Sequence, residues 1–248
     1  MSRKAALKTV DAEVTEIKTR NNTLRVRIDD LKTFQPLTEN QKKFFDAYKQ
    51  GDYFVALHGV AGTGKTFCAL YKALEEVLDK SNTFDKIIVV RSAVQSREIG
   101  HLPGDVGEKM EIYEQPYRQI CETLFGRKDA WSRLEEQGHI QFISTSFIRG
   151  MSFDDAIIIV DEVQNMNFEE IDTVMTRVGY RSKIIWCGDY RQTDLRKNND
   201  KSGLLKFFDI AHHMGAFTRI EFTPDDIVRS SLVKDYILAK LKYEDLNE

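Results

Sequence analysis

The chain has 248 residues, of which 42% are hydrophobic and 30% charged, and its formal net charge is -3 at pH 7. This composition is ordinary for a globular protein and excludes the disordered, collagen-like and coiled-coil classes. The longest purely apolar runs, Tyr53 to Leu57 and Ala156 to Val160, are far too short to cross a bilayer. We therefore predict no membrane span and expect a cytoplasmic protein. Three widely spaced cysteines indicate neither a disulfide framework nor a zinc site.

From residue 36 onward, short β-branched runs alternate with helical patterns, which is typical of a parallel sheet with crossover helices. Several of the runs are apolar almost throughout, as expected of strands covered on both faces. Apolar residues repeat at helical spacing between 70 and 78 and between 171 and 178. Asn167 and Glu170 have the spacing of a capping box for the second helix. Strands are predicted at Phe54 to His58, Ile87 to Val90, Ile140 to Ser144, Ala156 to Val160, Lys183 to Cys187 and Thr218 to Phe222.

Two segments fall outside this alternation. We interpret residues 1–35 as an N-terminal extension with a possible edge strand from Thr23 to Ile28, where apolar and basic residues alternate. Residues 92–115, rich in glycine, are predicted to form a long irregular loop that leads into a helix. The remainder, residues 36–248, is predicted to form one α/β domain.

The strongest motif stands between a predicted strand and a predicted helix, and its residues are Gly59, Val60, Ala61, Gly62, Thr63, Gly64, Lys65 and Thr66. Small residues let successive backbone N–H groups surround phosphates at the positive end of the following helix. In this pattern Lys65 is expected to reach the β- and γ-phosphates of a nucleotide, and the Thr66 hydroxyl to bind Mg²⁺. The alternative is a glycine-rich turn without a ligand.

A second motif, residues 157–162, is an apolar strand that ends in two adjacent carboxylates. If strand geometry continues through both, they project to opposite sides. We assign Asp161 to Mg²⁺ and Glu162 to the activation of a water molecule, a role that a nucleotide kinase does not need. A solvated acidic pair at a strand end is the alternative.

A third motif, residues 187–192, follows the next strand along the chain and contains Gln192. A glutamine at this place can contact both the γ-phosphate and the attacking water, and so can report hydrolysis to the rest of the fold.

The blocks HGVAGTGKT, IIIVDEVQN, MTRVG and GDYRQTDL, with LPGDVGEK and PDDIVRSSLV, together resemble the PhoH family of ATPases, relatives of superfamily-one helicases that keep only the first RecA-like domain. The resemblance runs from about Pro36 to Lys240. It implies a RecA-like fold, a mostly parallel sheet with helices on both faces, and an ATPase that uses ATP and Mg²⁺. Short forms of this family are common in bacteriophages, for which the location would be the host cytoplasm.

The resemblance also implies roles for single residues. Gln41 looks like the helicase glutamine that reads adenine, because an amide can pair with both edges of that base. Arg229 stands where the family carries a late arginine that could act on the γ-phosphate across a subunit interface, and Arg177 competes for that role. Either arginine could instead form an ordinary surface ion pair. The family's Arg-Gly-Arg-Thr reads Arg-Gly-Met-Ser at residues 149–152, which removes one basic side chain.

A missing second RecA-like domain implies a homo-oligomer in which a neighbouring subunit closes the ATP site, expected to be a hexameric ring. The resemblance further implies single-stranded nucleic acid as a partner. Residues 177–206 carry eight basic and three acidic side chains, a local balance of +5, and residues 1–33 carry eight and five, or +3. Both are candidate phosphate-binding surfaces, and Tyr113 and Tyr117 could stack on bases. Solvated charge and core tyrosines are the alternatives, and the sequence does not distinguish RNA from DNA.

Two other functions stay open at this point. A phosphate-loop kinase of a small metabolite would phosphorylate an acceptor molecule, and its rate would change little in a Glu162→Gln variant. A nucleotide-gated scaffold would bind ATP normally but hydrolyse it slowly, and its output would be the binding of partners.

Overall fold

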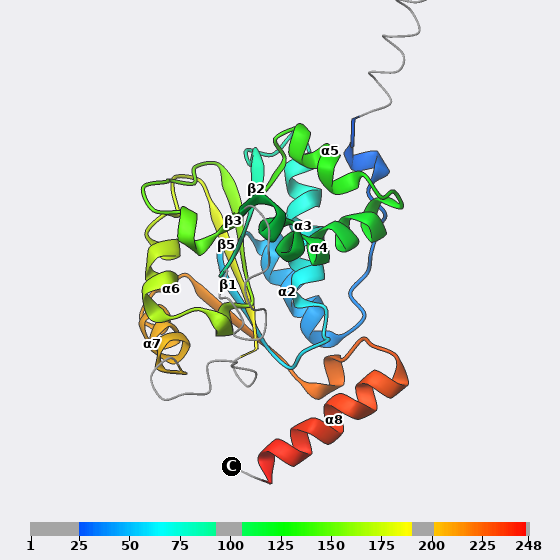
Figure 1. Ribbon diagram of the computed structural model, residues 1–248, viewed down its shortest axis with the longest axis vertical. Helices are drawn as coiled ribbons and strands as arrows, with labels where there is room; N and C mark the ends of the chain where they lie inside the picture. Colours follow the sequence, from blue (N-terminus) through cyan, green and yellow to red (C-terminus); the bar gives the residue numbers. More distant parts are fainter. Residues whose placement is uncertain (1–24, 93–105, 190–200, 247–248) are drawn as a thin grey trace, which may run out of the picture.

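The computed structural model describes residues 25–92, 106–189 and 201–246. Helices and strands alternate along nearly the whole of this part of the chain (Figure 1). The elements are η1 (Ile28–Asp30), α2 (Glu39–Gln50), β1 (Phe54–Gly59), α3 (Lys65–Leu78), β2 (Lys86–Arg91), α4 (Val106–Phe125), α5 (Ala130–Glu136), β3 (Ile140–Ser144), η2 (Thr145–Phe147), β4 (Ala156–Asp161), η3 (Val163–Asn165), α6 (Phe168–Met175), β5 (Lys183–Gly188), α7 (Lys201–His212), β6 (Phe217–Phe222), η4 (Pro224–Asp226) and α8 (Ser231–Asp245).

The strands form one six-stranded sheet in the order β3-β2-β4-β5-β1-β6, and every neighbouring pair is parallel. All six predicted strands are confirmed, with ends that differ by one residue at most. Because the strands are parallel, the residues that follow each of them gather at one edge of the sheet, where open α/β sheets bind ligands. The sequence order of the motifs thereby becomes a spatial cluster.

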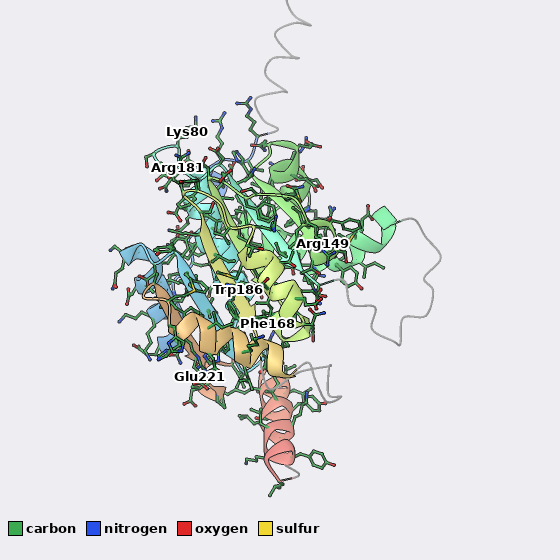
Figure 2. All side chains as sticks on the ribbon, turned by 90° about the vertical axis from the view of Figure 1, so that its left-hand side faces the viewer. Lys80, Arg149, Phe168, Arg181, Trp186 and Glu221 are labelled. Atoms are coloured by element: carbon green, nitrogen blue, oxygen red, sulfur yellow. The ribbon has the colours of Figure 1, made fainter. Side chains whose placement is uncertain are left out.

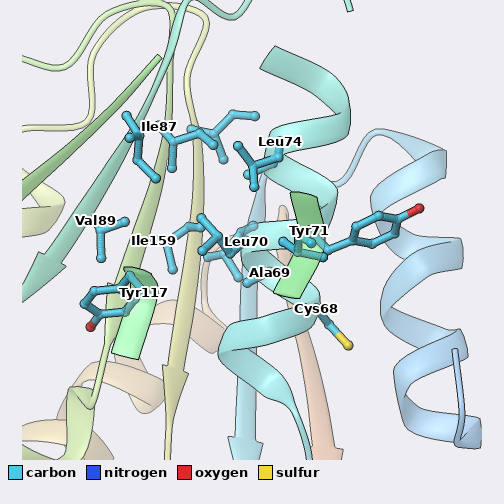
Figure 3. Packing of buried hydrophobic residues seen from close by; sticks show 14 of the residues in the cluster. Cys68, Ala69, Leu70, Tyr71, Leu74, Ile87, Val89, Tyr117 and Ile159 are labelled. Atoms are coloured by element: carbon cyan, nitrogen blue, oxygen red, sulfur yellow. The ribbon is translucent and has the colours of Figure 1, made fainter. Parts of the chain in front are cut away.

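Both faces of the sheet are covered by helices (Figure 1). Alternate residues of β4 belong to different apolar cores: Ile157 and Ile159 pack on the side of α3 and α4, and Ile158 and Val160 on the side of α6 and α7. Figure 3 shows the first core, where Leu70 of α3 lies against the sheet. This two-sided burial explains why the strands read as continuous apolar runs rather than alternating ones.

Both helices predicted from apolar spacing are present, as α3 and α6. The capping box of α6 is present: the Asn167 side chain accepts from the Glu170 N–H at 2.9 Å, and the Glu170 carboxylate accepts from the Asn167 N–H at 3.0 Å. The helix ends at Met175, so Val178, which fits the same helical spacing, lies beyond it and forms an isolated bridge with Phe153.

Two sequence-based expectations are wrong in part. Residues 25–27 are not in a strand and a 3-10 helix begins at Ile28; the alternation instead reflects burial of Val26 between two exposed arginines. Residues 106–115, predicted as loop, form the first half of α4. The glycine and Pro116 in this segment argued against a helix in the sequence. A proline inside a helix can bend it without ending it, and Pro116 lies within α4.

Among the described residues, no helix combines the length and apolar character that a membrane crossing requires. The three cysteines are buried and free of disulfides. Burial raises the pKa of the Cys68 thiol to about 12, so it stays protonated and behaves as a small apolar side chain.

Candidate active site

The glycine-rich loop connects β1 to α3 at the carboxyl edge of the sheet. The backbone of β6 approaches this loop closely: a Cβ on Gly59 would lie 2.1 Å from the carbonyl oxygen of Phe222, and the Val60 N–H donates to the same oxygen at 3.0 Å. Gly59 also has φ of +118°, which L side chains rarely adopt. Only glycine fits at this position, so the start of the loop is anchored to the last strand.

Lys65, the first residue of α3, folds over the loop. Its Nζ donates to the carbonyl oxygens of Gly59 at 3.0 Å and Val60 at 2.7 Å, and to the Thr63 hydroxyl at 3.3 Å. Burial lowers the pKa of the Lys65 ammonium, while the charge of Asp189 opposes that shift. A buried ammonium on the first residue of a helix is suited to bind phosphate, because it adds its charge to the N–H groups at that helix end.

Thr66 and Asp161, predicted as the two ligands of Mg²⁺, are in direct contact. The Thr66 hydroxyl donates to Asp161 Oδ1 at 2.7 Å, although the two residues are 95 positions apart. Among the described residues, no group of three His, Cys, Asp or Glu side chains could hold a metal ion. One hydroxyl and one carboxylate fit Mg²⁺ nonetheless, because this ion prefers oxygen ligands and takes most of them from nucleotide phosphates and water.

Glu162 does not continue the strand. Its φ of 53° and ψ of 42° are left-handed, so the premise that the two carboxylates project to opposite sides of an extended strand is wrong. Burial raises the pKa of Glu162, with Asp161 adding to this, whereas the charge of Arg91 lowers it. A carboxylate with a raised pKa at this edge of the sheet is suited to accept a proton.

Gln164 joins the second motif to the third. Its Nε2 donates to Glu162 Oε2 at 2.6 Å, and its Oε1 accepts from the Asp189 N–H at 3.0 Å. Asp189 is the last described residue before the segment that contains Gln192, and Gln192 itself lies outside the described residues.

Gln41 holds the glycine-rich loop from the outside. Its Nε2 donates to the Thr63 carbonyl at 2.9 Å, its Oε1 accepts from the Leu37 N–H at 2.8 Å, and only 4% of the residue is exposed. One N–H and one lone pair of the amide remain. The contact to adenine stays a prediction, and the contact to the loop is an additional role.

The two arginines considered for γ-phosphate binding lie at opposite edges of the sheet. Arg229 packs on the glycine-rich loop of its own chain, since a Cβ on Gly62 would lie 3.1 Å from its Cγ, and the adjacent Val228 N–H donates to the Gly62 carbonyl at 3.1 Å. The Arg177 carbonyl accepts from the Phe153 N–H, just before β4 begins. Arg177 is therefore at the amino edge, away from the loop.

In the described part of the predicted basic surface at 177–206, two of the basic residues are neutralised by ion pairs. Lys183 is 7% exposed and paired with Glu76, and Arg181 is paired with Asp155. Arg191, Arg196 and Lys197, which the prediction also included, lie outside the described residues. Figure 2 shows Arg181 near the upper end of the molecule and Phe168, which Lys206 covers at 3.9 Å, lower down.

The proposal that Tyr117 stacks on bases is wrong, because the residue is 0% exposed and its ring packs on Trp131 and Phe142. Tyr113 is half-buried, and the Arg91 guanidinium lies 5.7 Å from its ring centre. Most basic residues of the N-terminal group lie outside the described residues.

Sequence reasoning missed the contacts that three residues make in the site: Arg91, Tyr117 and Gln164. Arg91 is a lone charge at the carboxyl end of an apolar strand, which is a usable signal. Gln164 stood within a recognised block. The contact between Tyr117 and Asp161 depends on how α4 packs on the sheet, and no local sequence pattern predicts it.

The sequence profile described as "PhoH-like protein" matches residues 33–240. The chain belongs to the PhoH-like protein family. A PhoH-like protein of Mycobacterium leprae is 34% identical over 226 residues, which cover 90% of this chain and 63% of that protein. A PhoH-like protein of Bacillus subtilis is 36% identical over 209 residues, which cover 84% of this chain and 64% of that protein. The chain thus spans less than two thirds of the length of these relatives.

Among solved structures, the PhoH-like fold is similar to the large terminase of a thermophilic bacteriophage in complex with ATP-gamma-S. The TM-score is 0.50 at 13% identity, and the match covers 81% of this chain and 48% of the terminase. At this identity the likeness concerns the fold alone. It confirms the predicted α/β phosphate-loop class, with a sheet that is parallel throughout.

Proposed function

We propose that this PhoH-like protein is a Mg²⁺-dependent ATPase. The observation that carries the proposal is the 2.7 Å hydrogen bond between Thr66 and Asp161, which brings the end of β4 to the start of α3 beside the buried Lys65. Family membership supports the same reaction. The short phage-type form of the family stays a prediction.

Each side chain has a distinct part in the proposed reaction. Lys65 binds the β- and γ-phosphates, and Thr66 and Asp161 would hold Mg²⁺, which neutralises phosphate charge when bound. Glu162 accepts the proton of the attacking water, and Gln164 fixes its carboxylate at 2.6 Å. Gln192 as the sensor of the γ-phosphate remains part of the proposal.

Release of phosphate from ATP, measured with and without Mg²⁺, tests the proposal. Lys65→Ala should abolish turnover. Glu162→Gln should lower kcat by about 10²- to 10⁴-fold while ATP still binds, because only proton acceptance is lost. Glu169→Gln, an exposed acid on α6, is the matched control. A phosphorylated acceptor together with normal turnover in Glu162→Gln would favour the kinase instead.

We further propose that hydrolysis is coupled to single-stranded RNA or DNA. The resemblance to superfamily-one helicases supports this proposal. The described basic residues add little support, because Arg181 and Lys183 are held in ion pairs. ATPase rates with single-stranded RNA, single-stranded DNA or neither, over a salt series, test this. Stimulation that falls with salt indicates contact with phosphates. Normal ATP binding with slow turnover and no stimulation would favour the scaffold.

A ring-shaped homo-oligomer, with a hexamer as the expected form, is the proposed assembly. Arg177 lies at the amino edge, so it can reach only the nucleotide of a neighbouring copy, whereas Arg229 already lies on its own loop. Helix α8 supports an assembly, because it extends away from the sheet (Figures 1 and 2) and exposes 78% of Leu232 and 69% of Tyr236.

A further inference from the structure

The carboxylate of Asp161 is held from two helices. Oδ1 accepts from the Thr66 hydroxyl of α3 at 2.7 Å, and Oδ2 accepts from the Tyr117 hydroxyl of α4 at 2.9 Å. Asp161 is 6% exposed and Tyr117 is 0% exposed. The second hydrogen bond therefore forms in a site from which most water is excluded, where a carboxylate depends on such donors.

Packing of the Tyr117 ring fixes the position of its hydroxyl. The ring centre lies 6.1 Å from that of Trp131 and 5.8 Å from that of Phe142. Figure 3 shows the ring beside Val89, with its hydroxyl at the far side from the aliphatic core. A ring packed in this way leaves the hydroxyl little freedom, so the hydrogen bond constrains the carboxylate rather than following it.

The charge around the hydroxyl favours its role as a donor. Burial raises the pKa of Tyr117 well above its ordinary value, and the charge of Asp161 adds to this. The charge of Arg91 lowers the pKa of Tyr117, but burial outweighs it. The phenol stays protonated over any working pH, and the proton points to Asp161.

We infer that Tyr117 is a positioning residue for the Mg²⁺ ligand Asp161: it holds Oδ2 so that Oδ1 faces Thr66, where the ion of a magnesium nucleotide would bind. The inference rests on the proposed ATPase function. A carboxylate bonded on one oxygen presents the other in a fixed direction, which reduces the cost of ordering it when the ion binds.

The test is the Mg²⁺ dependence of nucleotide binding in Tyr117→Phe, which removes one oxygen and keeps the ring. A fluorescent ADP analogue is titrated at fixed free Mg²⁺ concentrations and in EDTA. The expected result is unchanged affinity in EDTA and a rise of about 10- to 100-fold in the Mg²⁺ concentration for half-saturation. Tyr48→Phe is the matched control, because Tyr48 is also buried and also donates to a carboxylate, that of Glu76.

A double-variant cycle separates positioning from general packing. If Tyr117 acts through Asp161, adding Tyr117→Phe to Asp161→Asn should not raise the half-saturating Mg²⁺ concentration further. An equal half-saturation in Tyr117→Phe and wild type, or an undiminished effect in the Asp161→Asn background, would overturn the inference. Absence of ATP turnover in the wild type would instead refute the proposed function.

Discussion

His58 lies directly before the glycine-rich loop and is 1% exposed. Its Nε2 accepts from Arg219 Nε at 2.7 Å, which requires the neutral ring. Burial, followed by the charges of Arg219 and Lys65, lowers the pKa of His58 from 6.5 to about 4. The histidine beside the glycine-rich loop is thus an uncharged hydrogen-bond acceptor near neutral pH and not an acid or base for catalysis there.

This lowered pKa predicts acid sensitivity of the fold. Between pH 6.5 and 4, His58 is protonated in the unfolded chain but stays neutral in the folded chain. The free energy of unfolding therefore falls as the pH falls. From pH 7 to pH 5 the loss should be about 2 kcal/mol, at 1.36 kcal/mol per pKa unit. Urea unfolding at both values measures it, and His58→Gln should lack this part of the loss. An equal loss in both proteins would contradict the assignment.

At the scale of elements, a buried ion pair joins α3 to β5 at the amino edge of the sheet. Lys183 Nζ lies 2.9 and 2.8 Å from the two Glu76 oxygens and 4.0 Å from the centre of the Tyr48 ring. The Tyr48 hydroxyl donates to the same carboxylate at 2.5 Å. One lysine thereby connects α2, α3 and the sheet, far from the glycine-rich loop.

Glu76→Gln should lower the free energy of unfolding by about 3–5 kcal/mol, because it leaves the Lys183 charge buried without a counterion. Chemical denaturation measures the change. Arg181→Ala breaks the ion pair with Asp155. Because the Arg181 side chain is 65% exposed, this variant should lower the free energy of unfolding by at most about 1 kcal/mol. Equal costs for the two variants would show that Lys183 is not dependent on Glu76.

The elements were predictable where local patterns decide them, and the contacts between elements were not. Continuous apolar runs placed β4 and β1 and their terminal motifs correctly, because a strand buried on both faces needs nothing else. The left-handed turn at Glu162, by contrast, follows from packing after the strand ends. The charge count over 177–206 overstated the free charge of Arg181 and Lys183 for a related reason: a sum over one segment ignores acidic partners that other segments supply.

At the scale of the whole molecule, the packing of a single chain does not explain why α8 is so exposed. None of its described residues is buried, yet it begins beside the site: a Cβ on Gly62 would lie 3.4 Å from Ile237 Cδ1. A copy bound along this helix would therefore lie next to the glycine-rich loop.

Leu232→Ser combined with Tyr236→Ser should lower the sedimentation coefficient of the assembled protein, because both side chains lose apolar contact area. Analytical ultracentrifugation over a concentration series measures this. Tyr180→Ser is the control, as Tyr180 is 83% exposed at the opposite edge of the sheet. A wild type that sediments as a monomer under assay conditions, or a double variant that assembles normally, would exclude this interface.

The hydrogen bond from the Val60 N–H to the Phe222 carbonyl has a consequence for synthesis of the chain. The nucleotide motif leaves the ribosome complete at residue 66, but the strand that anchors its first glycine follows more than 150 residues later. Until β6 has docked, the loop lacks the neighbour that fixes its shape, and long-range contacts of this kind form late. If the proposed function holds, tight nucleotide binding requires β6, and a nascent chain that stops before β6 carries the motif without its anchored loop.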